Sequence, residues 1–128
     1  MRLLLDTHIF LALIGSSSAN LPAAIVVLME DDEAESHLSA ASLWEIAIKC
    51  RLGMLRLVPE LDALPRILQR LGIRIVPIDE RHALVAVDPE PATRDPFDWM
   101  LLAQCQIEGL KLVTVDRALV SHRLAARP

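Results

Sequence analysis

Four short apolar runs along the chain predict the strands of a buried sheet. They are "RLLL" at 2–5, "SHLSA" at 36–40, "IRIVPI" at 73–78 and "KLVTV" at 111–115. Apolar runs of this length, several of them rich in branched side chains and bounded by polar residues, are typical of strands that lie inside a protein. The first and last runs each end at or just before an aspartate, which becomes important below.

The segments between these runs carry the spacing of amphipathic helices. Helical patterns cover 7–15, 21–32, 42–53, 61–72, 79–87 and 97–109, with a short tail helix after Asp116. Glycines end four of these patterns, and Pro22 is expected within a first helical turn. The stretches 16–20 and 89–96 read as loops. Strands that alternate with helices predict an α/β fold with a mostly parallel sheet, which binds ligands at the carboxyl ends of its strands.

Composition indicates one aliphatic domain over residues 1–128. Hydrophobic residues make up 53% of the chain and aromatic residues 3%, so the core must consist of Leu, Ile, Val and Ala. So much aliphatic surface predicts an exposed apolar patch, and hence an oligomer or a protein partner. The net charge of −4 excludes a generally basic nucleic-acid-binding protein, although 13 Lys and Arg leave room for a local basic cluster.

The cysteines and the apolar runs indicate a cytoplasmic protein. Cys50 and Cys105 are isolated, so we expect two small buried residues in a reducing compartment rather than a disulfide or a zinc site. Asp6 and His8 interrupt the N-terminal apolar run too early for a signal peptide. No apolar run is long enough to cross a membrane.

Four carboxylates stand in related places of this predicted fold. Asp6 and Asp116 directly follow strands, and Glu45 is expected in the first turn of the helix after the second strand. Asp98 is expected in the first turn of the helix that leads to the last strand. That helix would start at the opposite edge of the sheet if the chain simply alternated, so the long loop before it must carry the chain across.

Each acid also has an ordinary interpretation as a helix cap. Such caps are common and stabilise a helix by about 1 kcal/mol. The assignments would be Asp6 for the first helix, the capping box Ser42-Leu-Trp-Glu45, the start Asp95-Pro96-Phe-Asp98, and Asp116 for the tail.

Taken together, the acids predict more than caps. Carboxylates gathered at one edge would repel one another and raise each other's pKa values, which helix N-termini relieve only in part. A hard divalent cation relieves this repulsion better, and Mg²⁺ and Mn²⁺ prefer carboxylate and water oxygens. The pattern therefore indicates a metal site able to activate water and bind a phosphate.

Three stretches resemble the PIN-domain ribonucleases, and most closely the VapC-type toxins of bacterial toxin–antitoxin pairs. They are "LLLDTHIFL", "SAASLWEIAIKCRLG" and "RDPFDWMLLAQCQIEGLKLVTVD", in the right order over nearly the whole chain. The resemblance implies a PIN-like three-layer α/β/α fold with a small, mostly parallel central sheet. It also implies cleavage of RNA with Mg²⁺ or Mn²⁺, a homodimer, and a cognate antitoxin that inhibits the enzyme.

The family's acidic cluster maps onto four positions of this chain, which the resemblance makes both catalytic residues and metal ligands: Asp6, Glu45, Asp98 and Asp116. Asp95, Thr7 and Thr114 would then support these ligands or cap helices, and the residues that bind the substrate stay undefined. The chain departs from the family at two positions. Many relatives carry a basic residue where Trp99 stands and another where Val115 stands, which puts the usual hold on the RNA backbone in doubt.

Other residues and functions remain open from the sequence. An i,i+4 ion pair with Glu45 is expected for Lys49. Core packing is expected for Trp44 and Trp99, with base stacking as the alternative. The competing functions are a metal-dependent phosphohydrolase or phosphotransferase, and a non-catalytic interaction module whose acids only cap helices. The common phosphohydrolase site needs a second aspartate two residues after Asp6, where this chain has His8.

Overall fold

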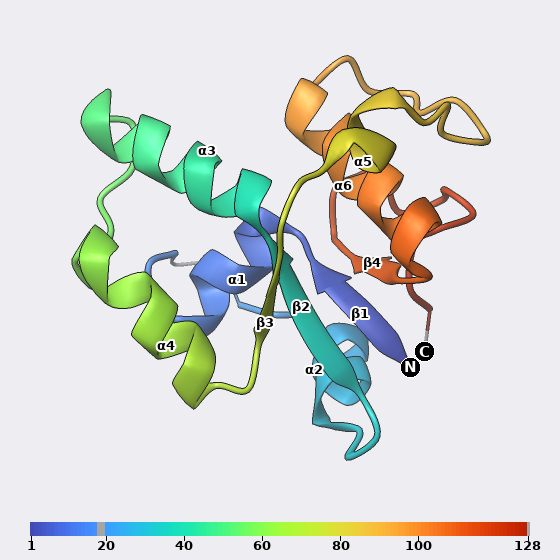
Figure 1. Cartoon of the computed structure of the whole chain (residues 1–128). Coiled ribbons are helices and arrows are strands. Elements are labelled where there is room, and N and C mark those ends of the chain that lie inside the picture. Colours follow the sequence, from blue (N-terminus) through green and yellow to red (C-terminus); the bar gives the residue numbers. More distant parts are fainter. Residues whose placement is uncertain (18–19, 128) are drawn as a thin grey trace.

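A computed structural model describes residues 1–17 and 20–127, with helices packed around a four-stranded sheet (Figure 1). The strands are β1 (Arg2–Leu5), β2 (Glu35–Ser39), β3 (Arg74–Val76) and β4 (Lys111–Val113). The helices are α1 (Thr7–Leu13), α2 (Ala23–Glu30), α3 (Ala40–Arg51), the 3₁₀ turn η1 (Leu61–Ala63), α4 (Leu64–Arg70), α5 (Glu80–Leu84) and α6 (Pro96–Glu108). The loop predicted at 16–20 includes residues 18–19, which lie outside the described residues.

All four strands are parallel, in the order β3-β2-β1-β4. The first strand is therefore central, and it pairs with β2 on one side and with β4 on the other. Leu4 is opposite His37 in β2 and Leu112 in β4, so the carboxyl ends of these strands meet at one edge. The predicted α/β class with a parallel sheet is confirmed.

Side chains of β1 alternate between two apolar layers. Leu3 and Leu5 pack into a cluster with residues of α1, α2, α3 and α4, whereas Leu4 packs into a second cluster with residues of α6. Because the strand is covered on both faces, its three leucines are fully buried. The three-layer α/β/α arrangement is thus built directly by the apolar patterns of the sequence.

The predicted starts of α3 and α2 are wrong, and the helix predicted over 79–87 ends at Leu84, because Val85 is extended. The predicted start of α3 at Ser42 is replaced by Ala40, because the Ser39 hydroxyl accepts a hydrogen bond from the N–H of Ala41 (3.0 Å) and serves as the N-cap. Ser42 and Glu45 are therefore inside the helix, and they do not form the expected capping box. Likewise, Pro22 is the N-cap residue of α2 rather than part of its first turn.

The predicted tail helix after Asp116 does not form among the described residues. The chain makes turns there instead, and Ala125 pairs with Leu112 as a parallel bridge. Backbone hydrogen bonds from Leu112 N–H to Leu124 and from Ala126 N–H to the Leu112 carbonyl hold the tail against β4. The tail turns back to pair with β4, and these contacts replace the predicted helix.

The segment from residue 85 to 95 explains how α6 starts beside the carboxyl end of β1. It runs along α6 in the opposite direction: the Asp88 N–H donates to Gln106 near the end of the helix, and Thr93 contacts Trp99 near its start. The loop therefore carries the chain back across the sheet, as the position of Asp98 required.

Further findings concern the cysteines and the membrane. Cys105 is buried as expected, while Cys50 is only partly buried. Within residues 1–17 and 20–127, no helix combines the length and the apolar character needed to cross a bilayer.

Candidate functional site

Asp6 lies at the point where β1 and β4 end side by side. Its backbone N–H donates to the carbonyl of Val113 (2.9 Å), and its Oδ2 accepts a hydrogen bond from the Thr114 hydroxyl (2.7 Å). The residue is only 7% exposed. Although Asp6 occupies the N-cap position of α1, its side chain makes no cap hydrogen bond. The strongest described contact of the carboxylate is therefore with Thr114, directly after β4, and the backbone N–H of Thr7 also favours its ionised form.

Burial raises the pKa of Asp6 above its ordinary value. The hydrogen bond from Thr114 and the charge of His8 oppose this rise, and the nearby charge of Asp116 adds to it. None of the described residues forms an ion pair with Asp6 that would offset the cost of burying its charge. A buried carboxylate without a cationic partner favours a bound cation at this position.

Glu45 reaches the same edge from the second turn of α3. It is 8% exposed, and its Oε1 lies 2.8 Å from the Thr7 hydroxyl, directly beside Asp6 in the chain. The Ser42 hydroxyl is 2.9 Å from the same Thr7 oxygen. Since each hydroxyl carries one proton, Thr7 can donate to the carboxylate while it accepts from Ser42. On its solvent side, Oε2 of Glu45 pairs with Lys49 at 3.0 Å, the i,i+4 contact expected from the sequence.

Asp98 is placed by the start of α6. Asp95 is the N-cap of this helix and accepts a hydrogen bond from the N–H of Phe97 (2.9 Å), with Pro96 at the first helical position. Asp98 is therefore the third residue of the helix, and its Oδ2 accepts a hydrogen bond from the Thr93 hydroxyl (3.1 Å). The cap thus fixes the direction in which the Asp98 carboxylate points.

The pKa of Asp98 is raised to about 6. Burial is the largest cause, followed by the charge of Asp95; the Thr93 hydrogen bond lowers the pKa, and the charges of Asp6 and Asp116 raise it further. Because the charges of Asp6 and Asp116 act on Asp98, residues more than 90 positions apart in the chain share one electrostatic neighbourhood.

Asp116 completes this edge from the loop after β4. Its N–H donates to the Thr114 hydroxyl (3.0 Å), the same hydroxyl that donates to Asp6. Its Oδ1 accepts from the N–H of Ala118 (2.8 Å), so Asp116 caps a turn rather than the predicted helix. In contrast to Asp6, this aspartate is exposed to solvent.

The chemistry of this edge fits a hard divalent cation. Its donors are carboxylate oxygens with water access through Asp98 and Asp116, the ligands that Mg²⁺ and Mn²⁺ prefer. Such a cation needs ionised carboxylates, and its positive charge would oppose both burial and the repulsion among the acids, which together raise the pKa of Asp98. The carboxylate oxygens of these acids do not form a compact group. No three of the four acids bring their ligand atoms within 4.8 Å of one another.

A compact set of that kind does occur elsewhere in the described residues. Asp79, His82 and Glu108 bring three ligand atoms within 4.8 Å of one another near the C-terminal end of α6. Arg81 already neutralises these acids, with Nη2 2.8 Å from both Asp79 Oδ2 and Glu108 Oε1. The Asp79 N–H donates to His82 Nδ1, which leaves the His82 Nε2–H to donate to Glu108. We therefore interpret this set as an ion-pair network that joins α5 to α6.

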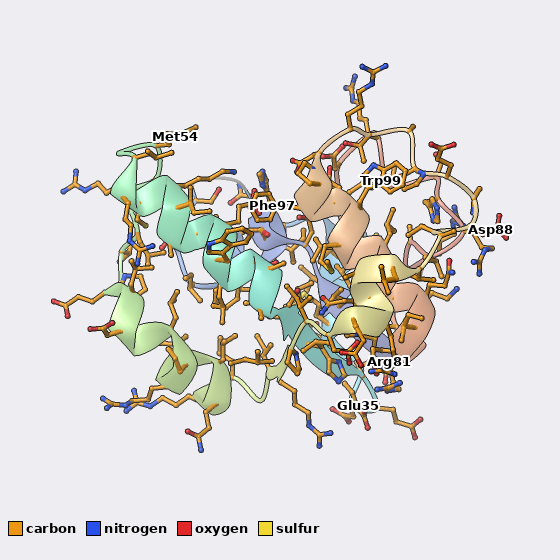
Figure 2. All side chains as sticks on the ribbon, turned by 45° about the horizontal axis from the view of Figure 1, so that its top comes forward. Glu35, Met54, Arg81, Asp88, Phe97 and Trp99 are labelled. Atoms are coloured by element: carbon orange, nitrogen blue, oxygen red, sulfur yellow. The ribbon has the colours of Figure 1, made fainter. Side chains whose placement is uncertain are left out.

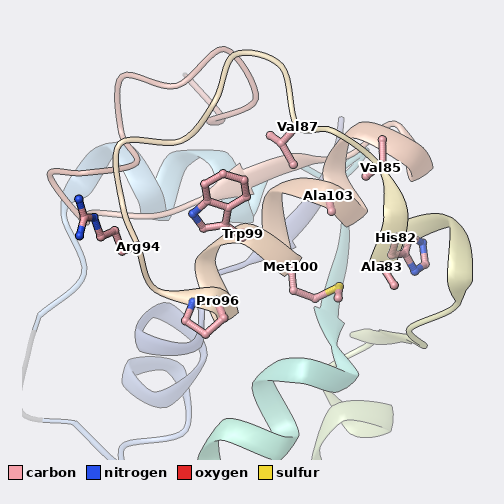
Figure 3. A pocket seen from close by; sticks show the side chains of 9 residues that line it. All are labelled: His82, Ala83, Val85, Val87, Arg94, Pro96, Trp99, Met100 and Ala103. Atoms are coloured by element: carbon pink, nitrogen blue, oxygen red, sulfur yellow. The ribbon is translucent and has the colours of Figure 1, made fainter.

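Trp99 has a role that the sequence did not reveal. Its indole N–H donates to the carbonyl of Thr93 (2.6 Å), and its ring lines a cavity of about 360 Å³ between α6 and the 85–95 segment. Figure 3 shows the ring inside this cavity and Arg94 extending away from the other lining residues. Trp99 therefore fastens the loop that carries Thr93, and through Thr93 it supports Asp98.

The other tryptophan contradicts its expected core position. Trp44 is 61% exposed. Val115, where the resemblance leads us to expect a basic residue, is also exposed, at 47%.

Sequence reasoning missed two hydroxyl residues next to the acids. Ser42 was assigned to a capping box, and Thr93 was not singled out, yet they support Thr7 and Asp98 respectively. A signal for Thr93 was present: a threonine two residues before an N-cap aspartate, close to a second acid, offers a local donor.

Comparison with known proteins places this geometry in a family. The PIN-domain profile matches residues 3–123, nearly the whole chain and all four acids. A search of curated protein sequences finds no match. The all-parallel sheet flanked by helices agrees with the PIN fold. The chain therefore belongs to the PIN-domain family, whose members are generally nucleases that use divalent metals.

Proposed function

We propose that this protein is an Mg²⁺- or Mn²⁺-dependent endoribonuclease that hydrolyses RNA phosphodiester bonds. The observation that carries the proposal is geometric: the Thr114 hydroxyl bonds both Asp6 and the N–H of Asp116, and Thr7, next to Asp6, bonds Glu45, so acids from distant parts of the chain meet at one end of the sheet. Folding has brought acids together at a cost, at the strand edge where parallel sheets bind ligands. An acid cluster of this kind is used by nucleases to hold metal ions.

Each acid has its own part in the proposed site. Asp6 and Asp98 would hold the metal directly, and Asp116 and Glu45 would hold it through waters or complete a second site. Thr7 and Thr114 orient two of these carboxylates through the hydrogen bonds described above. When bound, the metal would lower the pKa of a coordinated water. It would also place a positive charge beside the phosphate. An ionised carboxylate at this edge would accept the proton of the attacking water.

The alternative of an interaction module with acidic caps is poorly supported. Asp6 makes no cap hydrogen bond, Glu45 lies inside α3, and Asp98 accepts from a side chain while Asp95 caps its helix. Only Asp116 bonds to a following N–H, and it does so in a turn. Three of the four acids therefore have no capping function that would explain their position.

The decisive test compares the wild type with Asp6→Asn. Wild type should cleave single-stranded RNA with Mg²⁺ or Mn²⁺ and not with EDTA, and it should bind Mn²⁺ by calorimetry. Asp6→Asn should retain its circular dichroism spectrum, bind Mn²⁺ more weakly and lose cleavage. Asp32→Asn, an exposed acid before β2 at the other edge of the sheet, is the matched control and should behave as wild type.

Two results would contradict the proposal. Full cleavage by Asp6→Asn would remove the acids from the mechanism, and the absence of Mn²⁺ binding by wild type would favour the interaction module. A small phosphoester tested in parallel separates the phosphohydrolase alternative: hydrolysis of that ester without RNA cleavage would establish it instead.

The biological role that we propose is that of a VapC-like toxin, supported by the resemblance of its three motif stretches. The protein would then be a cytoplasmic homodimer that a small antitoxin, encoded beside it, inhibits. Expression should arrest bacterial growth, Asp6→Asn should not, and co-expression of the neighbouring gene product should restore growth. Growth arrest by the Asp6→Asn variant would show toxicity that does not depend on the nuclease. Sequencing of RNA ends in arrested cells would identify the target.

A further inference from the structure

An apolar cavity of about 460 Å³ lies between α3, the helix that carries Glu45, and the start of α6, the helix that carries Asp98. No charged residue lines this cavity. The lining residues are Ala41, Trp44, Ile48, Ile78, Pro96, Phe97 and Met100. Trp44 precedes Glu45 in the chain, and Phe97 precedes Asp98. In Figure 2, Phe97 lies on the side of α6 that faces α3, whereas Trp99 points from the opposite side. The cavity is thus bounded by the immediate neighbours of two acids.

Folding does not account for the position of Trp44. The side chain is 61% exposed, and its described ring contact is an edge-on packing against Phe97, with centroids 5.7 Å apart and planes at 61°. Ile78, on the same cavity, is 41% exposed. The chain has only two Trp, two Phe and no Tyr, so half of its aromatic rings stand at this cavity. An exposed apolar surface of this kind usually marks a binding site.

The acids on the same two helices indicate what the cavity would bind. A metal on the acids attracts a phosphate, and a nucleotide whose phosphate lies there carries its base into the immediate surroundings. Bases of single strands are free to leave their neighbours and stack on aromatic side chains, whereas those of a duplex are held inside it. A platform that offers aromatic ring faces accepts any base, because every base has a π-face that can stack on them.

We propose that Trp44 and Phe97 form a stacking platform for an unpaired base next to the scissile phosphate, so that the enzyme acts on single-stranded RNA. The proposal rests on the function proposed above and adds a substrate-binding residue to it. Trp44 is a binding residue here, and the acids carry out the chemistry.

Substitution at Trp44 tests the platform. Trp44→Leu keeps the apolar character but removes the aromatic face, and KM for a single-stranded RNA should rise about 5- to 140-fold, the effect of losing one stacked base. Trp44→Phe should keep KM within a few-fold of wild type. The value of kcat should change little in both variants. Leu84→Ala, which truncates an apolar side chain that is 84% exposed on α5, is the matched control and should leave KM unchanged.

Fluorescence gives a readout that does not require cleavage. In rapid mixing of wild type with Mg²⁺, before cleavage proceeds, a ten-nucleotide single-stranded RNA should quench the Trp44 emission, and an abasic ribose-phosphate strand of the same length should not. Quenching should disappear in Trp44→Phe, which retains Trp99, because Trp99 is committed to Thr93.

The outcomes separate this proposal from the one on which it rests. If wild type cleaves RNA but Trp44→Leu has an unchanged KM, or the abasic strand quenches equally, the platform is wrong and the nuclease stands. If wild type neither cleaves RNA nor binds Mn²⁺, the nuclease itself is wrong. A dimeric wild type that Trp44→Leu converts to a monomer in light scattering, with Trp44→Phe also monomeric, would assign the cavity to a second copy and overturn the platform.

Discussion

Replacing Asp98 by asparagine should stabilise the metal-free protein above pH 6. The pKa of Asp98 in the folded protein is raised from 3.8 to about 6, so the folded state holds this proton more tightly than the unfolded chain does. A carboxyl group whose pKa is raised by folding makes its full contribution to the free energy of unfolding below pH 3.8. That contribution is lost as the pH rises through about 6. Asparagine has nearly the same shape, remains neutral, and can still accept the hydrogen bond from Thr93.

The size of this stabilisation follows from the rise in the pKa of Asp98. A rise from 3.8 to about 6 corresponds to about 3 kcal/mol at 1.36 kcal/mol per pKa unit. Because the carboxylate is only half-buried, screening by water reduces this to about 1–2 kcal/mol. For a chain of this length, that free energy raises the melting temperature by about 4–7 °C.

The assay is thermal or urea unfolding of wild type and Asp98→Asn in EDTA, from pH 4 to pH 8. The two proteins should be nearly equal at pH 4 and diverge by pH 7, whereas Asp32→Asn should follow wild type throughout. Addition of Mn²⁺ at pH 7 should then stabilise wild type more than Asp98→Asn, because a ligand that binds only the folded state stabilises it. A constant difference from pH 4 to pH 8 would refute the electrostatic reasoning.

Three further substitutions probe the support of the acids, the substrate backbone and the core. Thr7→Val removes the hydroxyl bonded to Glu45 and should reduce Mn²⁺ affinity or kcat/KM about 10- to 100-fold; an unchanged value in calorimetry and kinetics would show that Glu45 needs no such support. Arg117, exposed beside Asp116 and without an ion pair in the described part of the chain, should contact phosphate. Arg117→Ala should therefore weaken RNA binding for all sequences and make the slope of log K against log salt shallower by about 0.7, whereas an unchanged slope would place Arg117 outside the interface. Leu102→Ala truncates a fully buried side chain of α6 and should cost about 2–5 kcal/mol in urea unfolding; a cost under 1 kcal/mol would mean that the second apolar cluster does not hold α6 to the sheet.

The elements that were predictable from the sequence depend on local patterns. Apolar runs marked the strands, and Asp95-Pro96 marked the start of α6, because caps and periodicity are properties of neighbouring residues. The start of α3 was misplaced since two serines, Ser39 and Ser42, could each serve as its cap, and only the end of β2 decides between them. The tail helix was overruled by the pairing of Ala125 with Leu112, a contact between chain segments.

The site itself was predictable as a set of residues but not as a geometry. Resemblance indicated the four acids, whereas the hydrogen bond between Thr114 and Asp6 spans 108 positions and has no local signal. Likewise, the bond from Trp99 to the backbone carbonyl of Thr93 is a structural contact that no side-chain pattern specifies. Burial was also unpredictable from residue type alone: the two tryptophans have opposite environments, one fastening a loop and the other facing solvent.

The pairing of β1 with β4 has a consequence for the synthesis of this protein. Asp6 emerges from the ribosome early, but the hydroxyl and backbone groups that hold it belong to Val113 and Thr114, and Asp116 follows them. A growing chain therefore carries the first acids long before it can arrange them. Under the proposed function, catalysis would have to wait until β4 has been made and has paired with the central strand, so an unfinished chain would not cleave the ribosomal and messenger RNA that produce it.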